Sequence, residues 1–205
     1  GFVWPRTYQT NVGIQRQIFS RMAVSASYIG TFNRNLPFGR DVNYPVANST
    51  ATNNGTNILA RRPNPAFGAV TLMDSDQYTD YNGLQLTFQM RQWHNISFNG
   101  FYTYSQTMSS AQVMNNTTQG GAQNFVKLAD EYGRADTDQR HVFSLNMNWE
   151  LDYYKGDNGF WSALLNGWAI SPIVKIRSGL PFTVTNGNGD ANLDGLVDGR
   201  DLFQL

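Results

Sequence analysis

Residues 143–151 have the sequence FSLNMNWEL, in which apolar and polar side chains alternate without a break. This alternation is typical of a β-strand whose two faces meet different environments, because successive side chains point to opposite sides. The same pattern occurs in four earlier stretches, at 7–19, 22–32, 84–91 and 96–105. In the first of them Arg16 interrupts the apolar set, and in a sixth, less regular stretch Pro172 interrupts the strand itself. We therefore predict an all-β chain.

The alternating stretches pair most simply as antiparallel hairpins with short turns, over about residues 7–32, 82–105 and 140–177. Long polar segments are expected to form loops, at about 33–80, 106–139 and 178–205. Transmembrane β-barrels have this layout, with short periplasmic turns, long extracellular loops and strands of about 9–11 residues. The strands of a soluble β-sandwich, the alternative fold, average only about 5–6 residues and their loops are mostly short.

The expected fold class is therefore all-β, an antiparallel up-and-down transmembrane β-barrel segment, with residues 1–205 forming one partial barrel domain. Six strands are too few to enclose a wide lumen, so we expect the segment to belong to a larger barrel. Aromatic residues make up 14% of the chain and gather near the predicted strand ends. Girdles of aromatic rings at both interfaces are expected of a membrane barrel.

The composition argues against several other classes of protein. The 205 residues include 15 Lys+Arg and 15 Asp+Glu, so the formal net charge is zero. Nucleic acid is not an expected partner, because phosphate binding needs an excess of basic residues. The absence of Cys rules out disulfides, thiolate metal sites and a Cys nucleophile. No apolar run approaches the roughly 18 residues of a membrane helix.

Several short motifs follow one another along the chain. They are NVGIQRQ at 11–17 with ASYIG at 26–30, YNGLQL at 81–86, GRADTDQRH at 133–141, and GW at 167–168 with RSGLPFTV at 177–184. In these motifs the chain resembles the barrel region of TonB-dependent outer-membrane receptors of the Oar-like type, which are common in acidobacteria. The resemblance spans most of the 205 residues.

The resemblance implies a protein of the bacterial outer membrane that contacts outer-membrane lipid. It also implies uptake of an extracellular nutrient, driven by the TonB system through a plug region. The plug, the energy-coupling box and the amino-terminal regulatory-like domain of the family have no counterpart in this sequence. We therefore expect this chain to supply barrel wall and extracellular loops, without enzymatic activity.

Residues 190–201, DANLDGLVDGRD, fit the spacing of a calcium-binding loop. The candidate metal ligands are Asp190, Asn192, Asp194, the carbonyl of Leu196, Asp198 and Asp201. Six to eight oxygens suit Ca²⁺, and Gly195 permits the sharp turn of such a loop. The last position is Asp rather than Glu, as in the calcium loops that dockerins carry. The alternative is a solvated turn, because Asp, Asn and Gly are common in turns.

A second charged group comprises Asp136, Asp138, Arg140 and His141. These residues either contact a ligand or metal, or form ion pairs that fix the base of a loop, and we favour the second interpretation. His94, beside Trp93 in a short turn, is expected at the level of the lipid headgroups. The chain shows no G-x-S-x-G elbow and no phosphate-binding loop, which agrees with the expectation of no enzyme.

Two other functions stay open at this point. One is a structural or adhesive cell-surface protein stiffened by calcium, and the other is a soluble secreted sandwich that binds glycans. The apolar faces distinguish them. A continuous outward band about 25 Å tall indicates a membrane wall. Packing against a second sheet indicates a sandwich, and open edges paired with neighbouring copies indicate an assembly.

The calcium loop predicts that chelation lowers the melting temperature of the protein, since a cation bound to the folded state stabilises it. The shift is expected to be absent in the Asp190→Ala and Asp194→Ala variants. Differential scanning fluorimetry with and without EDTA measures it. An unmodified protein whose melting temperature does not respond to chelation would contradict the prediction.

Overall fold

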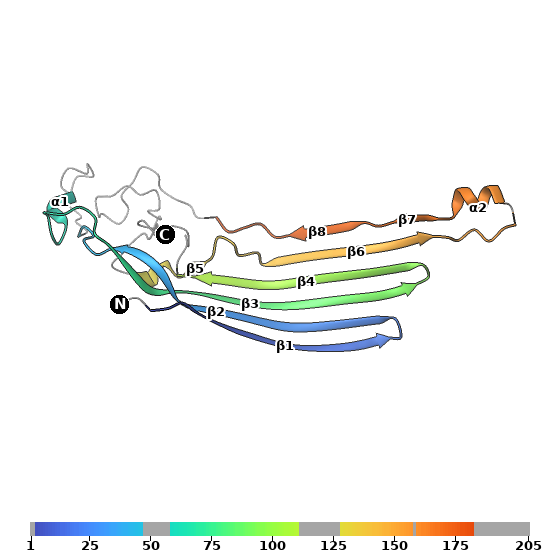
Figure 1. Ribbon diagram of the computed structural model, residues 1–205, viewed down its shortest axis with the longest axis horizontal. Helices are drawn as coiled ribbons and strands as arrows, with labels where there is room; N and C mark the ends of the chain where they lie inside the picture. The colour runs from blue at the N-terminus through green and yellow to red at the C-terminus, as the bar shows by residue number, and fades with distance from the viewer. Residues whose placement is uncertain (1–2, 47–57, 111–127, 158, 183–205) are drawn as a thin grey trace.

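The structure, a computed structural model, describes residues 3–46, 58–110, 128–157 and 159–182. Within these ranges the chain forms one antiparallel sheet of eight strands (Figure 1). The strands are β1 (Arg6–Phe19), β2 (Met22–Asp41), β3 (Thr71–Trp93), β4 (Ile96–Ser109), β5 (Gly133–Arg134), β6 (His141–Leu151), β7 (Trp168–Ile170) and β8 (Ile173–Arg177). The short helices are α1 (Ile58–Arg61), the 3-10 helix η1 (Leu128–Glu131) and α2 (Gly159–Leu165).

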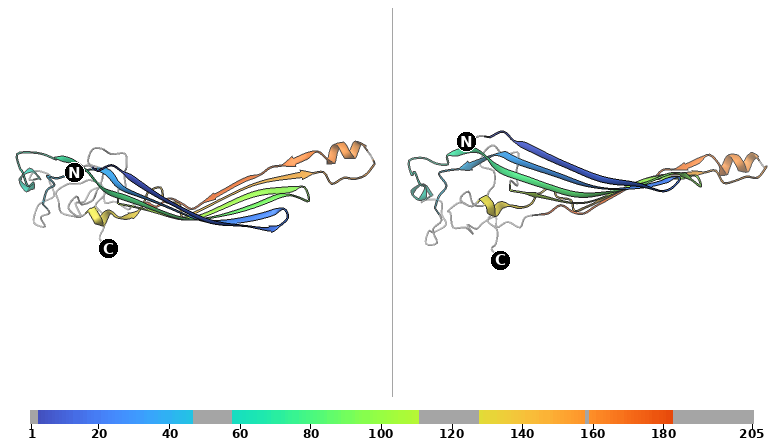
Figure 2. Two further views of the ribbon diagram at one scale, coloured as in Figure 1. Left: turned by 60° about the horizontal axis from the view of Figure 1, so that its bottom comes forward. Right: turned by 90° about the horizontal axis from the view of Figure 1, so that it is seen from below.

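The strands follow each other across the sheet in the order β1-β2-β3-β4-β6-β7. In addition, β5 pairs with β4, and β8 pairs with β6 beyond β7. The β1–β2 and β3–β4 turns and helix α2 lie at one end of the sheet, and α1 lies at the opposite end (Figure 1). Figure 2 shows that the sheet is twisted and curved. It is open, with β1 at one edge and β7 and β8 at the other.

Tight turns join the strands at the α2 end, as the sequence predicts. Between Trp93 and Ile96, which pair directly, His94 and Asn95 have φ of 47° and 64°. Positive φ at both central residues is the geometry of a two-residue turn that matches the twist of the strands, and Asn tolerates it well. Ser20 and Arg21 form the corresponding β1–β2 turn. The connection between β6 and β7 is longer and contains helix α2.

The predicted loop at 33–80 was wrong at both ends. Strand β2 continues to Asp41, and β3 already begins at Thr71. The reason is that apolar, polar and charged residues are mixed in these extensions, so the apolar alternation that marks the rest of the strands stops there. Salt bridges between Arg34 and Asp80 (2.5 Å) and between Arg40 and Asp74 (3.3 Å) join the two strands instead.

The second predicted loop, at 106–139, also contains strand residues. Strand β4 runs to Ser109, and its last residues pair with the two-residue strand β5. Two residues are too short to show any periodicity in the sequence. The strands therefore extend well beyond the apolar stretches, toward the end of the sheet where the long connections lie (Figure 1).

Pro172 separates β7 from β8, as expected from the sequence. The register is unbroken on either side, because Trp149 pairs with Ile170 and Asn146 pairs with Ile173. The amide of Met147 donates to the Pro172 carbonyl at 3.1 Å, but proline has no N–H to return the bond. One hydrogen bond of the ladder to β6 is therefore missing at the point where β7 ends and β8 begins.

Replacing Pro172 with Val is expected to fuse β7 and β8 into one strand. The new amide can donate to Met147, which contributes about 1 kcal/mol to the free energy of unfolding. Urea titration of the full-length protein in lipid vesicles measures this change, with Pro5→Val, outside any strand, as the control. A variant no more stable than the control would show that proline is not what divides this edge.

Candidate functional site

The apolar residues of six strands lie opposite one another in continuous rows. One row contains Ile14, Ala26, Leu86, Tyr102, Phe143 and Ile176. Directly paired residues project from the same face of a sheet, so each row runs across the whole width of the wall. Two residues further along, the next row contains Val24, Phe88, Gly100, Leu145 and Val174. The apolar set predicted from each strand therefore forms one surface.

This surface is not covered by another layer of the described residues. Side chains of the edge strands are the most accessible, with Ile14 76% and Ile176 61% exposed. Large apolar side chains in water would cost about 25 cal/mol for every Å² left accessible. Such a surface suits the hydrocarbon of a bilayer, and the described strands form one sheet without a second sheet packed on it.

The height of the apolar surface matches a bilayer. Strand β6 is 11 residues long, so it rises about 33 Å, or about 25 Å along the membrane normal at a tilt near 40°. At its turn end, the indole of Trp149 donates to the Tyr153 hydroxyl at 3.0 Å, which donates to the His94 carbonyl at 2.8 Å. At the other end, the Tyr28 hydroxyl donates to Asn82 at 2.6 Å. Aromatic residues with polar partners thus flank the band, as predicted.

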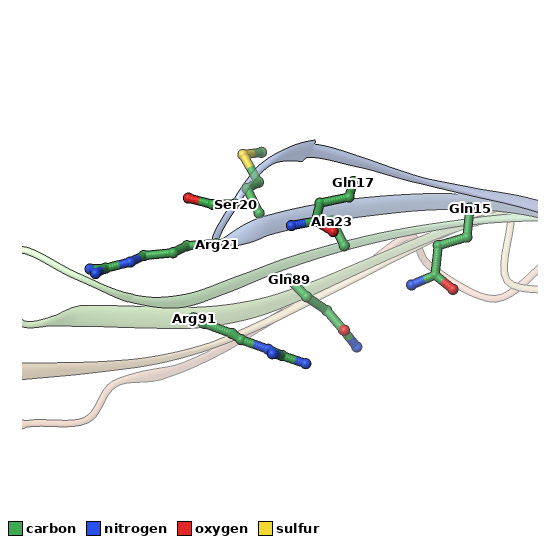
Figure 3. A pocket seen from close by; sticks show the side chains of 8 residues that line it. Gln15, Gln17, Ser20, Arg21, Ala23, Gln89 and Arg91 are labelled. Atoms are coloured by element: carbon green, nitrogen blue, oxygen red, sulfur yellow. The ribbon is translucent and has the colours of Figure 1, made fainter.

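The opposite face is polar with few charges. One row contains Gln15, Ser25, Thr87, Phe101 and Ser144, and the next contains Gln17, Ala23, Gln89, Asn99 and Asn146. Phe101 is the one large apolar side chain among these residues. Near the β1–β2 turn a hollow of about 360 Å³ opens on this side of the sheet. Figure 3 shows Gln15, Gln89 and Arg91 extending from the sheet into it. Amide and guanidinium groups can bind water or the polar groups of another protein segment, which suits the inner wall of a barrel.

Asp138 fixes the second long connection to the sheet. Its carboxylate is fully buried and accepts from the Thr107 amide at 2.7 Å and from Arg134 Nε at 2.8 Å. A nitrogen of Arg140 lies 3.9 Å from the same carboxylate. Two of the residues predicted as an ion-pair cluster, Asp138 and Arg140, therefore do come together at a loop base. We refer to this arrangement as the Asp138 lock.

The other two members of that predicted cluster lie elsewhere. Asp136 is exposed, two residues from the lock. The His141 ring faces the apolar side, where its Nδ1 lies 2.8 Å from the Tyr102 hydroxyl and its centroid lies 5.2 Å from that of Tyr104. His141 is the first residue of β6, and its pairing with Tyr104 places its side chain on the apolar face. Arg140 precedes the strand, and its guanidinium lies 5.9 Å from the centre of the Tyr104 ring.

A buried polar network at the first long connection has no counterpart in the sequence analysis. Asp41 and Arg62 form a buried salt bridge of 2.6 Å, and the same guanidinium nitrogen donates to the Asn43 carbonyl at 2.7 Å. The Asn43 side chain donates to three carbonyls, including that of Gly68 at 2.8 Å. Asp41 and Arg62 are 21 residues apart, so no local motif reveals the pair.

Above the apolar band, the outer face becomes charged. The Arg34–Asp80 pair lies there, and the Tyr132 hydroxyl donates to Asp80 at 3.2 Å. Burial raises the pKa of the Tyr132 hydroxyl above its usual value, and the Asp80 carboxylate raises it further. These groups belong to the water-exposed end of the wall.

The predicted calcium ligands at 190–201 lie outside the described residues, so the calcium loop stays a prediction. In the part of the chain that the structure describes, no group of three or more His, Asp or Glu side chains is placed to hold a metal ion. No helix among the same residues is long and apolar enough to cross a membrane.

An antiparallel sheet with one apolar and one polar face, short turns at one end and long connections at the other, is the wall of a transmembrane β-barrel. Known proteins agree, because the family described as outer membrane beta barrel domain matches residues 1–201. The chain belongs to this family and is located in the outer membrane.

One solved structure is similar, the outer membrane transporter YddB from Escherichia coli, with 12% sequence identity and a TM-score of 0.48. The match covers 72% of this chain and 19% of the transporter, so the chain spans about a fifth of that protein's length. No curated protein matches the sequence.

The two faces of β6 predict opposite responses to the same substitution. Leu145→Arg places a charge on the lipid face, well before the end of β6 at Leu151, and is expected to lower the unfolding free energy by about 2–4 kcal/mol. Ser144→Arg, one residue away on the polar face, is expected to cost less than about 1 kcal/mol. Urea unfolding of the full-length protein in vesicles compares the two. Equal losses would mean that the faces are not distinct.

If the Asp138 lock holds the base of the loop, its removal should loosen the structure locally. Asp138→Asn removes the charge that Arg134 and the Thr107 amide share, at a cost of about 2 kcal/mol. Hydrogen exchange at the Thr107 amide should accelerate, and the following connection should be cleaved faster by protease. Asp136→Asn, which changes an exposed carboxylate in the same segment, is the matched control. If both variants behave alike, Asp138 does not hold the loop base.

Proposed function

We propose that this chain is part of the wall and extracellular loops of a TonB-dependent receptor that takes up a nutrient across the outer membrane. In this proposal, the long connections capture the nutrient outside the cell. A plug inside the barrel blocks the lumen until the TonB system moves it. The residues described above hold the loops in place and present a polar surface to the lumen, and no enzymatic step is assigned to them.

The observation that carries the proposal is the position of the motifs that resemble the Oar-like receptors. The motif at 133–141 contains the Asp138 lock, which attaches the second long connection to β4. The start of the motif at 177–184 lies beside it. The His141 amide donates to Ser178 Oγ at 3.1 Å, and the Ser178 amide donates to the His141 carbonyl at 2.9 Å. Motifs far apart in the sequence thus form one structural unit at the base of the loops.

The character of the inner face is the second support. Ser, Thr, Asn and Gln predominate in its rows, and this face offers hydrogen bonds without a strong field of one sign. Such a wall can contact a folded plug or line a wet passage. Loops that a rigid scaffold holds often carry recognition, and the Asp41–Arg62 network and the Asp138 lock provide such fixed bases.

A calcium ion at residues 190–201 is a further part of the proposal. The stretch follows β8, which ends at Arg177 at the end of the sheet with the long connections (Figure 1). In the barrel topology that end is extracellular. Extracellular calcium modules bind with dissociation constants on the order of 10⁻⁴–10⁻³ M, and this affinity is the one we expect for the loop.

The test of TonB dependence uses the full-length protein, purified in detergent, and the periplasmic domain of TonB from the same bacterium. Biolayer interferometry should detect saturable binding, which deletion of the protein's energy-coupling segment abolishes. The Asp138→Asn variant should still bind TonB, because the lock lies at the extracellular end. A full-length protein without affinity for TonB, whose gene deletion abolishes cell adhesion instead, would favour the adhesive alternative.

A further inference from the structure

Arg16 lies on the apolar face of the sheet, inside the band that faces lipid. It pairs with Val24, which pairs with Phe88 on the next strand, so its side chain projects from the same face as theirs. The residue is exposed, and no described residue forms a hydrogen bond or ion pair with its guanidinium. A charged side chain in this position needs a partner, because an unpaired charge in hydrocarbon is expensive.

The position of Arg16 along the strand indicates where that partner lies. Strand β1 ends three residues later, at Phe19, which is about 10 Å along a strand. Arginine stems lie along apolar surfaces while the charged group reaches the interface. Because short turns of such barrels face the periplasm, the guanidinium reaches the headgroups of the periplasmic leaflet. Phosphate is the anion there, and arginine binds it through two parallel hydrogen bonds.

An apolar groove adjoins Arg16 on the same face. It has a volume of about 590 Å³ and is lined by residues of β1, β2 and β3. The hollow arises at Ala26, whose small side chain lies in one row between the larger Ile14 and Leu86. Val24 and Phe88 line the part of the groove next to Arg16. The site therefore combines a channel for a hydrocarbon chain with a cation at its periplasmic end.

We propose that Arg16 and this groove bind one phospholipid of the periplasmic leaflet. One acyl chain lies against Ala26 between Ile14 and Leu86, and the phosphate accepts hydrogen bonds from the Arg16 guanidinium. The groove is continuous with the lipid-facing band, and the charge of Arg16 is complementary to that of the phosphate. The site depends on the outer-membrane location of the wall and not on TonB or on any transported nutrient.

The experiment measures lipid binding to the delipidated full-length protein by native mass spectrometry. The probes are dioleoylphosphatidylethanolamine and dioleoylglycerol, which has the same chains without a phosphate. Arg16→Gln should weaken binding of the phospholipid by about tenfold or more, as expected for the loss of a charge-assisted bond. Its effect on dioleoylglycerol should be small. Lys175→Gln removes a positive charge from the polar face of the same sheet, where Lys175 pairs with Ser144, and should change neither affinity.

A second variant tests the groove itself. Ala26→Phe fills the hollow with an apolar side chain that suits a lipid-facing position, and it should weaken binding of both probes while Arg16 is kept. Folding of each variant is checked by its shift in gel mobility on heating. Wild-type affinity in Ala26→Phe, or in folded Arg16→Gln, would overturn the proposal. So would a dimer that binds no lipid and dissociates in Ala26→Phe, because a second copy would then occupy the groove.

Discussion

Every backbone N–H and C=O that faces hydrocarbon must be hydrogen-bonded within the protein, because the bilayer core offers no water to replace a missing partner. An antiparallel sheet that is closed into a barrel meets this requirement, and its alternating side chains then place one set of residues in lipid and the other in the lumen. The two demands are met together only in one register. A slip of one residue in any pair of strands would turn Leu86 or Phe143 toward the lumen and a polar neighbour toward lipid.

This constraint explains which parts of the fold could be predicted from the sequence. Within the band, alternate residues of each strand face lipid and lumen. The alternating stretch 143–151 and its counterparts therefore predict both the strands and their faces. Beyond the band the two faces no longer separate lipid from lumen, so parity carries no signal and the sequence predicts loops where β2 and β3 extend. The break in the strand at Pro172 could also be predicted from the sequence, because the effect of a missing N–H is confined to that residue.

The candidate sites, too, divide into one that could be predicted from the sequence and one that could not. The Asp138–Arg140 pairing could be predicted because its members are close in the sequence, whereas the partner of Asp41 lies 21 residues away and only the folded connection brings Arg62 to it. The sequence groups His141 with its neighbours, whereas the strand places its ring beside Tyr102 and Tyr104 on the apolar face. The polar networks at both loop bases and the apolar band below them together form a wall that is fixed in the membrane and holds its extracellular connections in place.

The most direct test of the two-faced wall is site-directed spin labelling of residues 142–149 in the full-length protein, in lipid vesicles. Collisions with oxygen, which concentrates in lipid, should be most frequent at 143, 145 and 147. Collisions with a water-soluble nickel chelate should be most frequent at 144, 146 and 148. A period of two with opposite phases is the predicted result. Labels shielded from both reagents at 143, 145 and 147 would show that these side chains pack inside a dry core, and would contradict the account.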